Sequence, residues 1–301
     1  MAGGMGKRGS RSRAGYLLVL FTLLWGVLSA CTSRTPASEP GRLRIAILPD
    51  QEETHIRAQY EPLVEYLYRQ LGMEVELRVP PGYAQLANWF HTRQVELVLF
   101  GGVTYVQAHL ADDAVPLVIR DLDGRNRSVL VVRRESPARA VTDLRGRSLA
   151  FGDRLSTTGH VMPRFYLELE GIAVDEYFRD VQYSGAHDLT AEWVRDGRID
   201  AGVTNSGVLA SMLRDGRLQK DDLRIVWESP PLADYVWAVP ADMPRELKIR
   251  IRNAFLLMNY APENDALLRR LGANYYLPAD HEEFTLLERL LRNQAPQGGT
   301  P

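Results

Sequence analysis

Short apolar segments alternate with segments of helical periodicity along most of this chain, and this alternation restricts the fold more than any other feature. In the first third, residues 43–48, 75–79 and 95–100 have the length and apolar content of strands. Residues 56–71 and 83–90, which separate them, carry apolar residues at helical spacing. The β-α-β-α-β order predicts a parallel sheet with helices on both faces.

The pattern then restarts, which favours a second lobe. The later predicted strands cover residues 115–119, 128–132, 149–151, 181–183, 199–204, 223–227 and 235–239, with helices over 187–196 and 206–213 and a largely helical segment from Glu246 onward. Few of these strands exceed six residues, and 301 residues suit two domains better than one. We expect an α/β protein of two lobes, each with a mostly parallel sheet flanked by helices. Its ligand cleft lies between the lobes, at the carboxyl ends of the strands.

The first 30 residues are built differently from the rest. They contain four basic residues and no acidic residue, and they continue into an apolar run over residues 16–28. A basic head followed by a short apolar run predicts a secretory signal peptide over residues 1–30; the alternative is a membrane anchor, for which the run is short. Cys31 follows, and residues 32–41 read as a flexible tether.

Composition excludes several classes of function. Without its first 30 residues the chain has 271 residues and a formal charge of −6, which argues against nucleic acid as a partner. Its single cysteine cannot form an internal disulfide. The six histidines lack metal-ligand spacing, and no nucleophile elbow, zinc-protease motif or phosphate-binding glycine loop occurs. We therefore expect no enzyme activity, no catalytic residues, no metal and no cofactor.

Three consecutive hydroxyl residues stand between a predicted strand and a predicted helix. They are Ser156, Thr157 and Thr158, followed by Gly159. One hydroxyl is enough to cap a helix. Three hydroxyls and free backbone N–H groups at the positive end of a helix also suit a tetrahedral oxyanion. The sequence leaves both interpretations open.

Three further polar residues follow strands and are candidate ligand contacts. His187 opens a predicted helix, where it is either a structural cap or a neutral hydrogen-bond donor. Asn205 ends a strand and is as well suited to a turn as to a ligand. Tyr105 follows Gly101 and Gly102 in the first lobe and is otherwise a packing residue.

Taken in order, many segments resemble the periplasmic substrate-binding proteins of phosphonate- and phosphite-type ABC transporters. The resemblance runs from about Leu43 to about Leu291. It is carried by residues 100–108, 143–146, 156–160 with Phe151 and Pro163, 183–188, 200–202 with Asn205, and 227–231. The segments 158–164 and 184–188 look most like a branch associated with selenate transport. Leu28-Ser29-Ala30-Cys31 resembles a bacterial lipobox.

The resemblance implies a type II periplasmic-binding-protein fold and a set of ligand contacts. Ser156, Thr157 and Thr158 match the hydroxyls that hold the oxyanion, and His187 matches the histidine that completes the pocket. Tyr83 matches a cleft tyrosine, and Asp234 matches an aspartate near the return crossover. Lobe 1 is expected at residues 42–125 and 230–295, lobe 2 at 126–229, and a disordered tail at 296–301, with hinges near 124–128 and 227–234.

Two departures from the family pattern concern ligand choice. Relatives that bind aminoalkylphosphonates place a glutamate where this chain has Gly207, and a cleft tyrosine where it has residues 125–127, Arg-Asn-Arg. Losing a carboxylate and gaining cations should weaken an ammonium site. We therefore expect a small tetrahedral oxyanion, phosphite-, phosphonate- or phosphate-like or selenate, over 2-aminoethylphosphonate.

The leading hypothesis is a monomeric binding protein that delivers this oxyanion to the transmembrane subunits of an ABC permease. It is expected on the periplasmic side of a bacterial membrane, attached to lipid through Cys31. A ligand-sensing protein that feeds a signalling partner is the alternative. An exported enzyme acting on a phospho-ester ranks third, because neither a metal site nor an activated nucleophile is evident.

Overall fold

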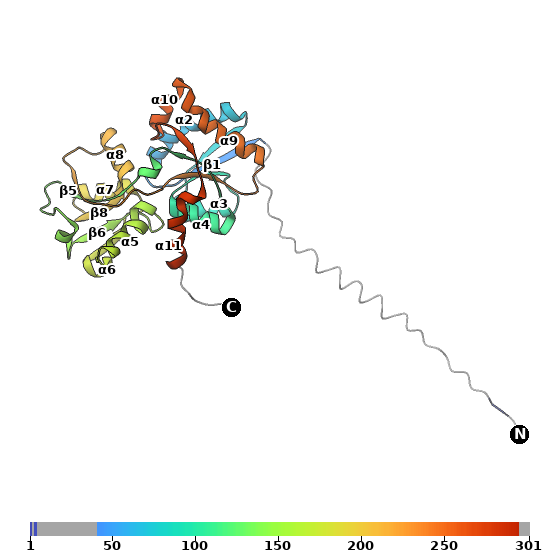
Figure 1. Cartoon of the computed structure of the whole chain (residues 1–301), viewed down its shortest axis with the longest axis horizontal. Helices are drawn as coiled ribbons and strands as arrows, with labels where there is room; N and C mark the ends of the chain where they lie inside the picture. Colours follow the sequence, from blue (N-terminus) through green and yellow to red (C-terminus); the bar gives the residue numbers. More distant parts are fainter. Residues whose placement is uncertain (2, 5–40, 295–301) are drawn as a thin grey trace. The chain divides into compact units, whose positions relative to one another are not determined.

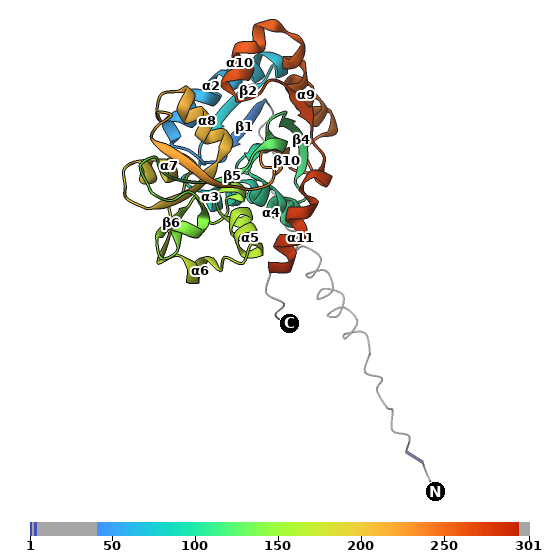
Figure 2. The same cartoon turned by 60° about the vertical axis from the view of Figure 1, so that its left-hand side comes forward.

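Two β-sheets covered by helices organise the chain (Figures 1 and 2). The computed structural model describes residues 1, 3, 4 and 41–294. The signal peptide, Cys31, almost all of the tether and the tail expected at 296–301 lie outside the described residues. Within the described part of the chain, no helix is long and apolar enough to cross a membrane.

The first sheet has the strand order β11-β4-β10-β3-β1-β2. Its strands are β1 (Arg42–Ile47), β2 (Glu74–Arg78), β3 (Leu97–Phe100), β4 (Val115–Arg120), β10 (Val236–Val239) and β11 (Tyr276–Pro278). The helices of this lobe are α2 (Glu53–Leu71), α3 (Tyr83–His91), α4 (Gly102–Asp112), α9 (Arg245–Leu257), α10 (Asp265–Arg270) and α11 (Thr285–Gln294). β11 was not expected, since the segment after Glu246 reads as helical.

The second sheet has the order β7-β6-β8-β5-β9. Its strands are β5 (Ser128–Arg133), β6 (Ser148–Phe151), β7 (Asp180–Tyr183), β8 (Ala201–Asn205) and β9 (Leu223–Glu228). The helices beside it are η3 (Thr157–Val161), α5 (Met162–Leu169), α6 (Val174–Tyr177), α7 (His187–Arg195) and α8 (Ser206–Arg214). Two lobes are thus present, as the alternation of strands and helices predicts.

Most strands of each sheet run in one direction, as expected, but both sheets are mixed, because β10 and β11 in the first and β5 in the second run the opposite way. β1 pairs in parallel with β2 and β3, but β10 runs antiparallel to β3 and β4, and β11 antiparallel to β4. In the second sheet β6 is parallel to β7 and β8, whereas β5 is antiparallel to β8 and β9. A parallel neighbour needs a long crossover, usually a helix. The chain enters β5 and β10 directly from the other lobe, without a crossover helix. These two strands can therefore run antiparallel to their neighbours.

Two segments carry the chain between the lobes, and they run beside each other. A single antiparallel bridge joins Asn126 to Leu232, with the Leu232 N–H donating to the Asn126 carbonyl at 2.8 Å. The Arg127 guanidinium donates to the Ser229 carbonyl at 2.7 Å. These bonds tie the two crossings together, so any change in lobe angle must involve both of them.

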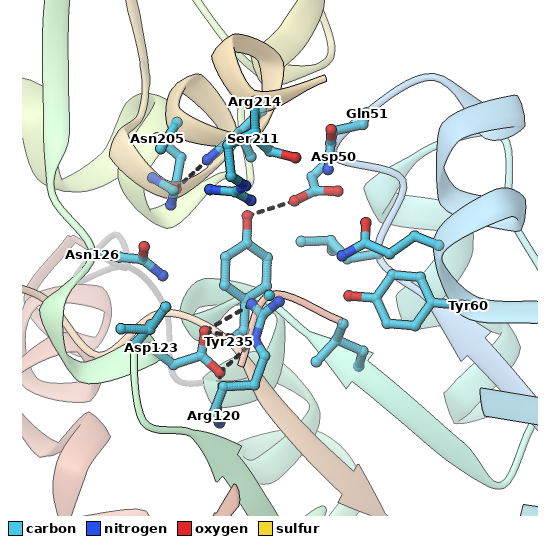
Figure 3. Close-up of a pocket in the computed structure, with 18 residues that line it drawn as sticks. Asp50, Gln51, Tyr60, Arg120, Asp123, Asn126, Asn205, Ser211, Arg214 and Tyr235 are labelled. Carbon is cyan, nitrogen blue, oxygen red and sulfur yellow. Dashed lines mark hydrogen bonds and ion pairs between the residues drawn. The ribbon is translucent and has the colours of Figure 1, made fainter. Parts of the chain in front are cut away.

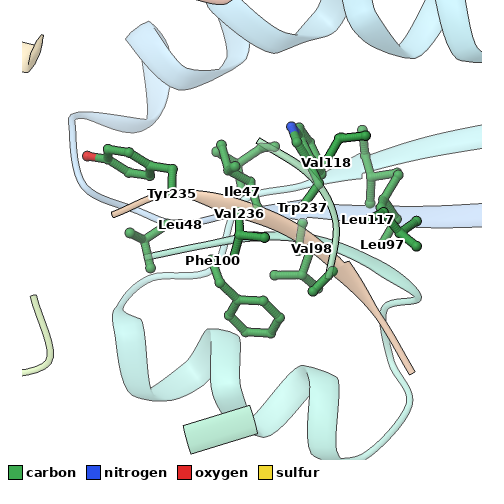
Figure 4. Packing of buried hydrophobic residues seen from close by; sticks show 14 of the residues in the cluster. Ile47, Leu48, Leu97, Val98, Phe100, Leu117, Val118, Tyr235, Val236 and Trp237 are labelled. Atoms are coloured by element: carbon green, nitrogen blue, oxygen red, sulfur yellow. The ribbon is translucent and has the colours of Figure 1, made fainter. Parts of the chain in front are cut away.

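The centre of the first sheet is apolar on both faces. All four residues of β3 and of β10 are buried, as expected for strands covered by helices on each side. Trp237 of β10 packs against Tyr60 of α2, with ring centroids 6.2 Å apart, and against Phe255 of α9, at 5.1 Å. Figure 4 shows this core with Tyr235 at its edge. The packing fixes the positions of Tyr60, on α2, and of Tyr235, directly before β10.

Candidate functional site

The strand ends of both sheets supply a buried polar cluster where the lobes meet. Asp50 follows β1, Gly101 follows β3, and the hydroxyl segment follows β6. His187 and Asn205 stand at the starts of α7 and α8. Carboxyl ends of strands are the usual place for ligands in α/β sheets. Five of the proposed ligand residues lie here: Ser156, Thr157, Thr158, His187 and Asn205. Ser156 contacts His187, whereas Thr158 and Asn205 both bind Asp234 of the other lobe.

Ser156 is the N-cap of the helix that follows β6. Its Oγ accepts a hydrogen bond from the Gly159 N–H at 3.0 Å, and the first turn, η3, is π-helical before α5 begins. The capping interpretation of Ser156 is therefore correct. It does not exclude the anion interpretation, because accepting a bond leaves the hydroxyl proton free to donate. π-helical turns are frequent at functional sites.

Gly159 is required by the close approach of His187. A Cβ at residue 159 would lie 2.7 Å from Ser156 Oγ and 2.8 Å from His187 Cε1. Both distances are shorter than van der Waals contact allows, so any larger residue would push His187 away from the hydroxyl segment. Because residue 159 has no side chain, the His187 imidazole and the Ser156 hydroxyl can both pack against its backbone.

His187 is neutral and only partly hydrogen-bonded. Burial lowers the pKa of its imidazole to about 3, so it carries no charge at physiological pH. Nε2 lies 3.4 Å from Ser156 Oγ, while Nδ1 is buried without a hydrogen-bond partner in the described structure. The backbone N–H of His187 donates to the Asp50 carbonyl at 2.8 Å. A neutral imidazole can still donate one hydrogen bond to an anion.

Tyr83 opens α3 and is 2% exposed. Ser156 lies beside its hydroxyl, which finds no partner of normal hydrogen-bond geometry among the described residues. Burial, reinforced by the charge of Asp50, raises the pKa of Tyr83 well above its ordinary value, so the hydroxyl keeps its proton. A buried unpartnered donor is costly, and a bound acceptor would satisfy it.

Thr158 and Asn205 bind an acid of the other lobe. Thr158 Oγ1 donates to Asp234 Oδ2 at 2.8 Å, and Asn205 Nδ2 donates to the same oxygen at 2.9 Å and to Thr158 Oγ1 at 3.0 Å. Burial raises the pKa of Asp234. The Thr158 proton is thus already engaged by a carboxylate, whereas the partner of the Ser156 hydroxyl proton is the neutral His187. Asn205 also caps α8, with Oδ1 accepting from the Gly207 N–H at 2.7 Å, so the turn interpretation holds for it as well.

Tyr105 is not brought to this cluster. Its hydroxyl hydrogen-bonds to His281 Nδ1 at 3.1 Å, and its ring packs on Phe284, with centroids 4.7 Å apart. Tyr105 lies on the second turn of α4, and its side chain faces the 3-10 turn η6 (His281–Phe284), which precedes α11, instead of the cleft. The prediction that it contacts ligand is therefore not supported, and its packing interpretation accounts for it.

A pocket of about 150 Å³ adjoins the cluster and shares Asn205, Asp50 and Tyr235 with it (Figure 3). The Tyr235 hydroxyl donates to the Asp50 carboxylate, whose pKa is raised to about 7 by burial, with Asp188 and Asp234 adding to the shift. The sequence reasoning missed Asp50, although its position after a strand was a usable signal. It also missed Tyr60, Arg120, Arg214 and Tyr235, which come from four separate segments with no common pattern.

The cations expected at residues 125–127 do not line this pocket. Of that triplet only Asn126 does, because Arg127 is bonded to Ser229 and Arg125 is exposed. The lining cations are Arg120 and Arg214 instead. Gly207 does line the pocket, and a Cβ there would lie 2.9 Å from Asn126 Oδ1.

Among residues 41–294, no group of three or more His, Cys, Asp or Glu side chains is placed to hold a metal ion.

Comparison with known proteins assigns the family. A family profile described as "ABC transporter, phosphonate, periplasmic substrate-binding protein" matches residues 45–284. A probable ABC transporter phosphite binding protein, PhnD1 of Prochlorococcus marinus, is 26% identical and aligns over 92% of this chain and 96% of its own length. The phosphonates-binding periplasmic protein of Escherichia coli is 24% identical, over 84% and 76%.

Solved structures agree on the fold. The structure of PhnD1 in complex with methylphosphonate superposes with a TM-score of 0.80 at 24% identity, covering 85% of this chain and 98% of that one. The aliphatic sulphonate binding protein SsuA of Escherichia coli gives 0.59 at 14% identity, over 85% and 93%. With the profile spanning most of the chain, this protein belongs to the family of periplasmic substrate-binding proteins of phosphonate ABC transporters, which bind their substrates without transforming them.

Proposed function

We propose that this protein captures a small tetrahedral oxyanion between its lobes and delivers it to the transmembrane subunits of an ABC importer. The candidate ligands are phosphite, phosphate, simple phosphonates and selenate. The names of the curated relatives support the first three, since they refer to phosphite, phosphonates and phosphate import. Cys31 is the proposed point of lipid attachment, and a monomer is the proposed working form.

One observation carries the proposal: three buried donors from three separate segments remain incompletely bonded at one place. They are the Ser156 hydroxyl, the His187 imidazole and the Tyr83 hydroxyl. An anion with several oxygens could accept from the Tyr83 hydroxyl and from whichever proton of Ser156 or His187 is not used in the bond between them. The helix over residues 157–169 adds the positive end of its dipole at the same point. Because the exported chain has a net charge of −6, anion binding must come from such local donors.

Isothermal titration calorimetry with the purified protein tests the ligand class. The panel contains phosphite, phosphate, methylphosphonate, sulfate, selenate and 2-aminoethylphosphonate. At least one of the first three or selenate should bind, and 2-aminoethylphosphonate should bind more weakly than methylphosphonate. If none of these anions binds, the assignment of the site to an oxyanion is wrong.

Delivery and anchoring need cell-based tests. Uptake of the tightest-binding anion should fall when the gene is deleted and return when it is restored. Normal uptake in the deletion strain, with a lost transcriptional response to the anion, would support the sensing alternative instead. Metabolic labelling with a fatty acid should mark the parent protein and leave the Cys31→Ser variant unlabelled.

A further inference from the structure

The pocket beside the hydroxyl cluster is larger than a bare oxyanion needs. Holding one water takes roughly 10–15 Å³ of such space, and this pocket offers about 150 Å³. It begins at Asn205, Asp50 and Tyr235, which the cluster shares, and continues between α2 and α8 (Figure 3). A ligand whose oxyanion sits at the cluster would therefore direct any substituent into this space.

The acids that line the pocket are already satisfied. Arg120 forms a two-pronged ion pair with Asp123, with Nη2 2.7 Å from Oδ1 and Nε 3.0 Å from Oδ2, and its backbone N–H adds a bond of 2.8 Å. Asp50 accepts from the Tyr235 hydroxyl, and burial holds its pKa near 7. Asp123 is thus fully paired with Arg120, and Asp50 is protonated in a large fraction of molecules near pH 7, which weakens the pocket as a site for an ammonium group.

Several donors of the pocket, in contrast, have nothing to bind. The Tyr60 hydroxyl and the Asn126 amide belong to residues only 5% and 7% exposed, and neither side chain has a hydrogen-bond partner in the described part of the chain. Burial raises the pKa of Tyr60, which keeps its hydroxyl protonated as a donor. Arg214, at the last turn of α8, lines the pocket from its exposed side and has no ion pair within residues 41–294.

We infer that this pocket is a second subsite, which binds a carboxylate carried by the ligand a few atoms from its phosphorus. Arg214 supplies the compensating charge, and Tyr60 and Asn126 supply hydrogen bonds. A planar guanidinium matches a carboxylate in geometry as well as in charge. The substrate class is a short carboxylated phosphonate, and this inference rests on the proposed function, because the oxyanion anchors the ligand.

The test compares ligands that differ only in the charge of the substituent. Calorimetry with the purified protein would use phosphonoacetate and 3-phosphonopropionate, each against its neutral amide, with methylphosphonate and 2-aminoethylphosphonate as references. At least one carboxylate should bind about fivefold or more tightly than its amide. The amine-bearing ligand should bind less tightly than that carboxylate.

Variants then assign the preference to residues. Arg214→Gln should reduce the carboxylate-to-amide ratio of affinities to near one, and Tyr60→Phe should reduce it in part. Arg252→Gln, which removes an exposed arginine of α9 outside the pocket, is the matched control and should leave the ratio unchanged.

The outcomes separate this inference from the proposed function. Binding of methylphosphonate, with carboxylates no tighter than their amides, would overturn the subsite and leave the oxyanion site standing. A carboxylate preference that survives Arg214→Gln would equally overturn the assignment. If no phosphonate binds at all, the proposed function itself is wrong.

Discussion

Thr157 Oγ1 of one lobe accepts a 3.0 Å hydrogen bond from the backbone N–H of Val103 on the other. Val103 lies in the first turn of α4, directly after the Gly101-Gly102 pair. A Cβ at Gly102 would lie 3.2 Å from Thr157 Oγ1, so the small residue permits the approach. Thr157 is proposed to bind the ligand, and it also forms a hydrogen bond between the lobes. The same atom, Oγ1, would therefore take part both in ligand binding and in lobe closure.

Replacing Thr157 by Ala removes both contributions. The loss of one charge-assisted hydrogen bond amounts to roughly 1.5–3 kcal/mol, so affinity for the bound oxyanion should fall about tenfold or more. Calorimetry measures the change. Thr142→Ala, an exposed threonine of the second lobe, is the control and should bind as the parent does. Parent-like affinity of the Thr157 variant would place the anion elsewhere.

A carboxylate introduced at Gly207 should change the ligand preference. Gly207→Glu places an acid in the pocket, so affinity for methylphosphonate should fall and affinity for 2-aminoethylphosphonate should rise, each several-fold. Because the new Cβ meets Asn126 at 2.9 Å, the substitution is best made together with Asn126→Ala. The Gly207→Gln/Asn126→Ala pair separates charge from size. Equal behaviour of the Glu and Gln proteins would contradict a charge-based selection.

A set of hydrogen bonds away from the hydroxyl cluster also joins the lobes. Asp188 Oδ2 accepts from the Glu52 N–H at 3.0 Å and from Arg217 Nη1 at 3.2 Å, while Arg217 Nη2 donates to Gln51 Oε1 at 3.0 Å. Gln51→Ala removes one bond to a cation and leaves the buried Asp188–Arg217 pair intact. Ligand affinity should fall about threefold to tenfold, because the closed form loses stability relative to the open form.

Small-angle scattering of the ligand-free protein checks the cause. The Gln51→Ala variant should have a larger radius of gyration than the parent without ligand and the same radius with saturating ligand. Gln107→Ala, an exposed glutamine on α4, is the control. An affinity loss with no change in the ligand-free radius would rule out an effect through closure.

Asp50 should make the protein lose stability as pH rises. Burial raises the folded-state pKa of this carboxyl from its ordinary value near 3.8 to about 7, so between these values the folded state holds a proton that the unfolded state has released. The free energy of unfolding contributed by this group therefore falls as pH rises from about 4 to 7 and is constant above. Asp50→Asn, which cannot ionise, should remove this slope.

Urea unfolding at pH 5, 6, 7 and 8 measures the effect. The stability of Asp50→Asn relative to the parent should increase with pH over this range. Asp121→Asn, an acid outside the buried cluster, should give no such trend. Parallel curves for Asp50→Asn and the parent would show that Asp50 titrates normally.

Local sequence was sufficient for most of the elements, β11 excepted, and for the placement of most residues of the polar cluster beside strand ends. The hydroxyl run after Phe151 and the residues at the starts of α7 and α8 are adjacent to strand ends, and the strand-end rule brings them together without knowledge of the packing. The same rule does not account for the position of the Tyr105 side chain, which was predicted to contact the ligand. It lies on the second turn of α4, where rotation about the helix axis turns its side chain to Phe284. Only the tertiary position of the 3-10 turn His281–Phe284 shows that contact.

The sequence by itself determined the alternation of strands and helices, the two lobes and the placement of hydroxyls at a helix start, because each depends on neighbouring residues. Strand direction was decided by tertiary structure: hydrophobic patterning is the same for parallel and antiparallel strands, and β5 and β10 take their direction from the crossings between lobes. The pocket beside the hydroxyl cluster also depends on tertiary structure. Tyr60, Arg120 and Arg214 are far apart in sequence, and their meeting depends on how α2, β4 and α8 pack around the lobe interface.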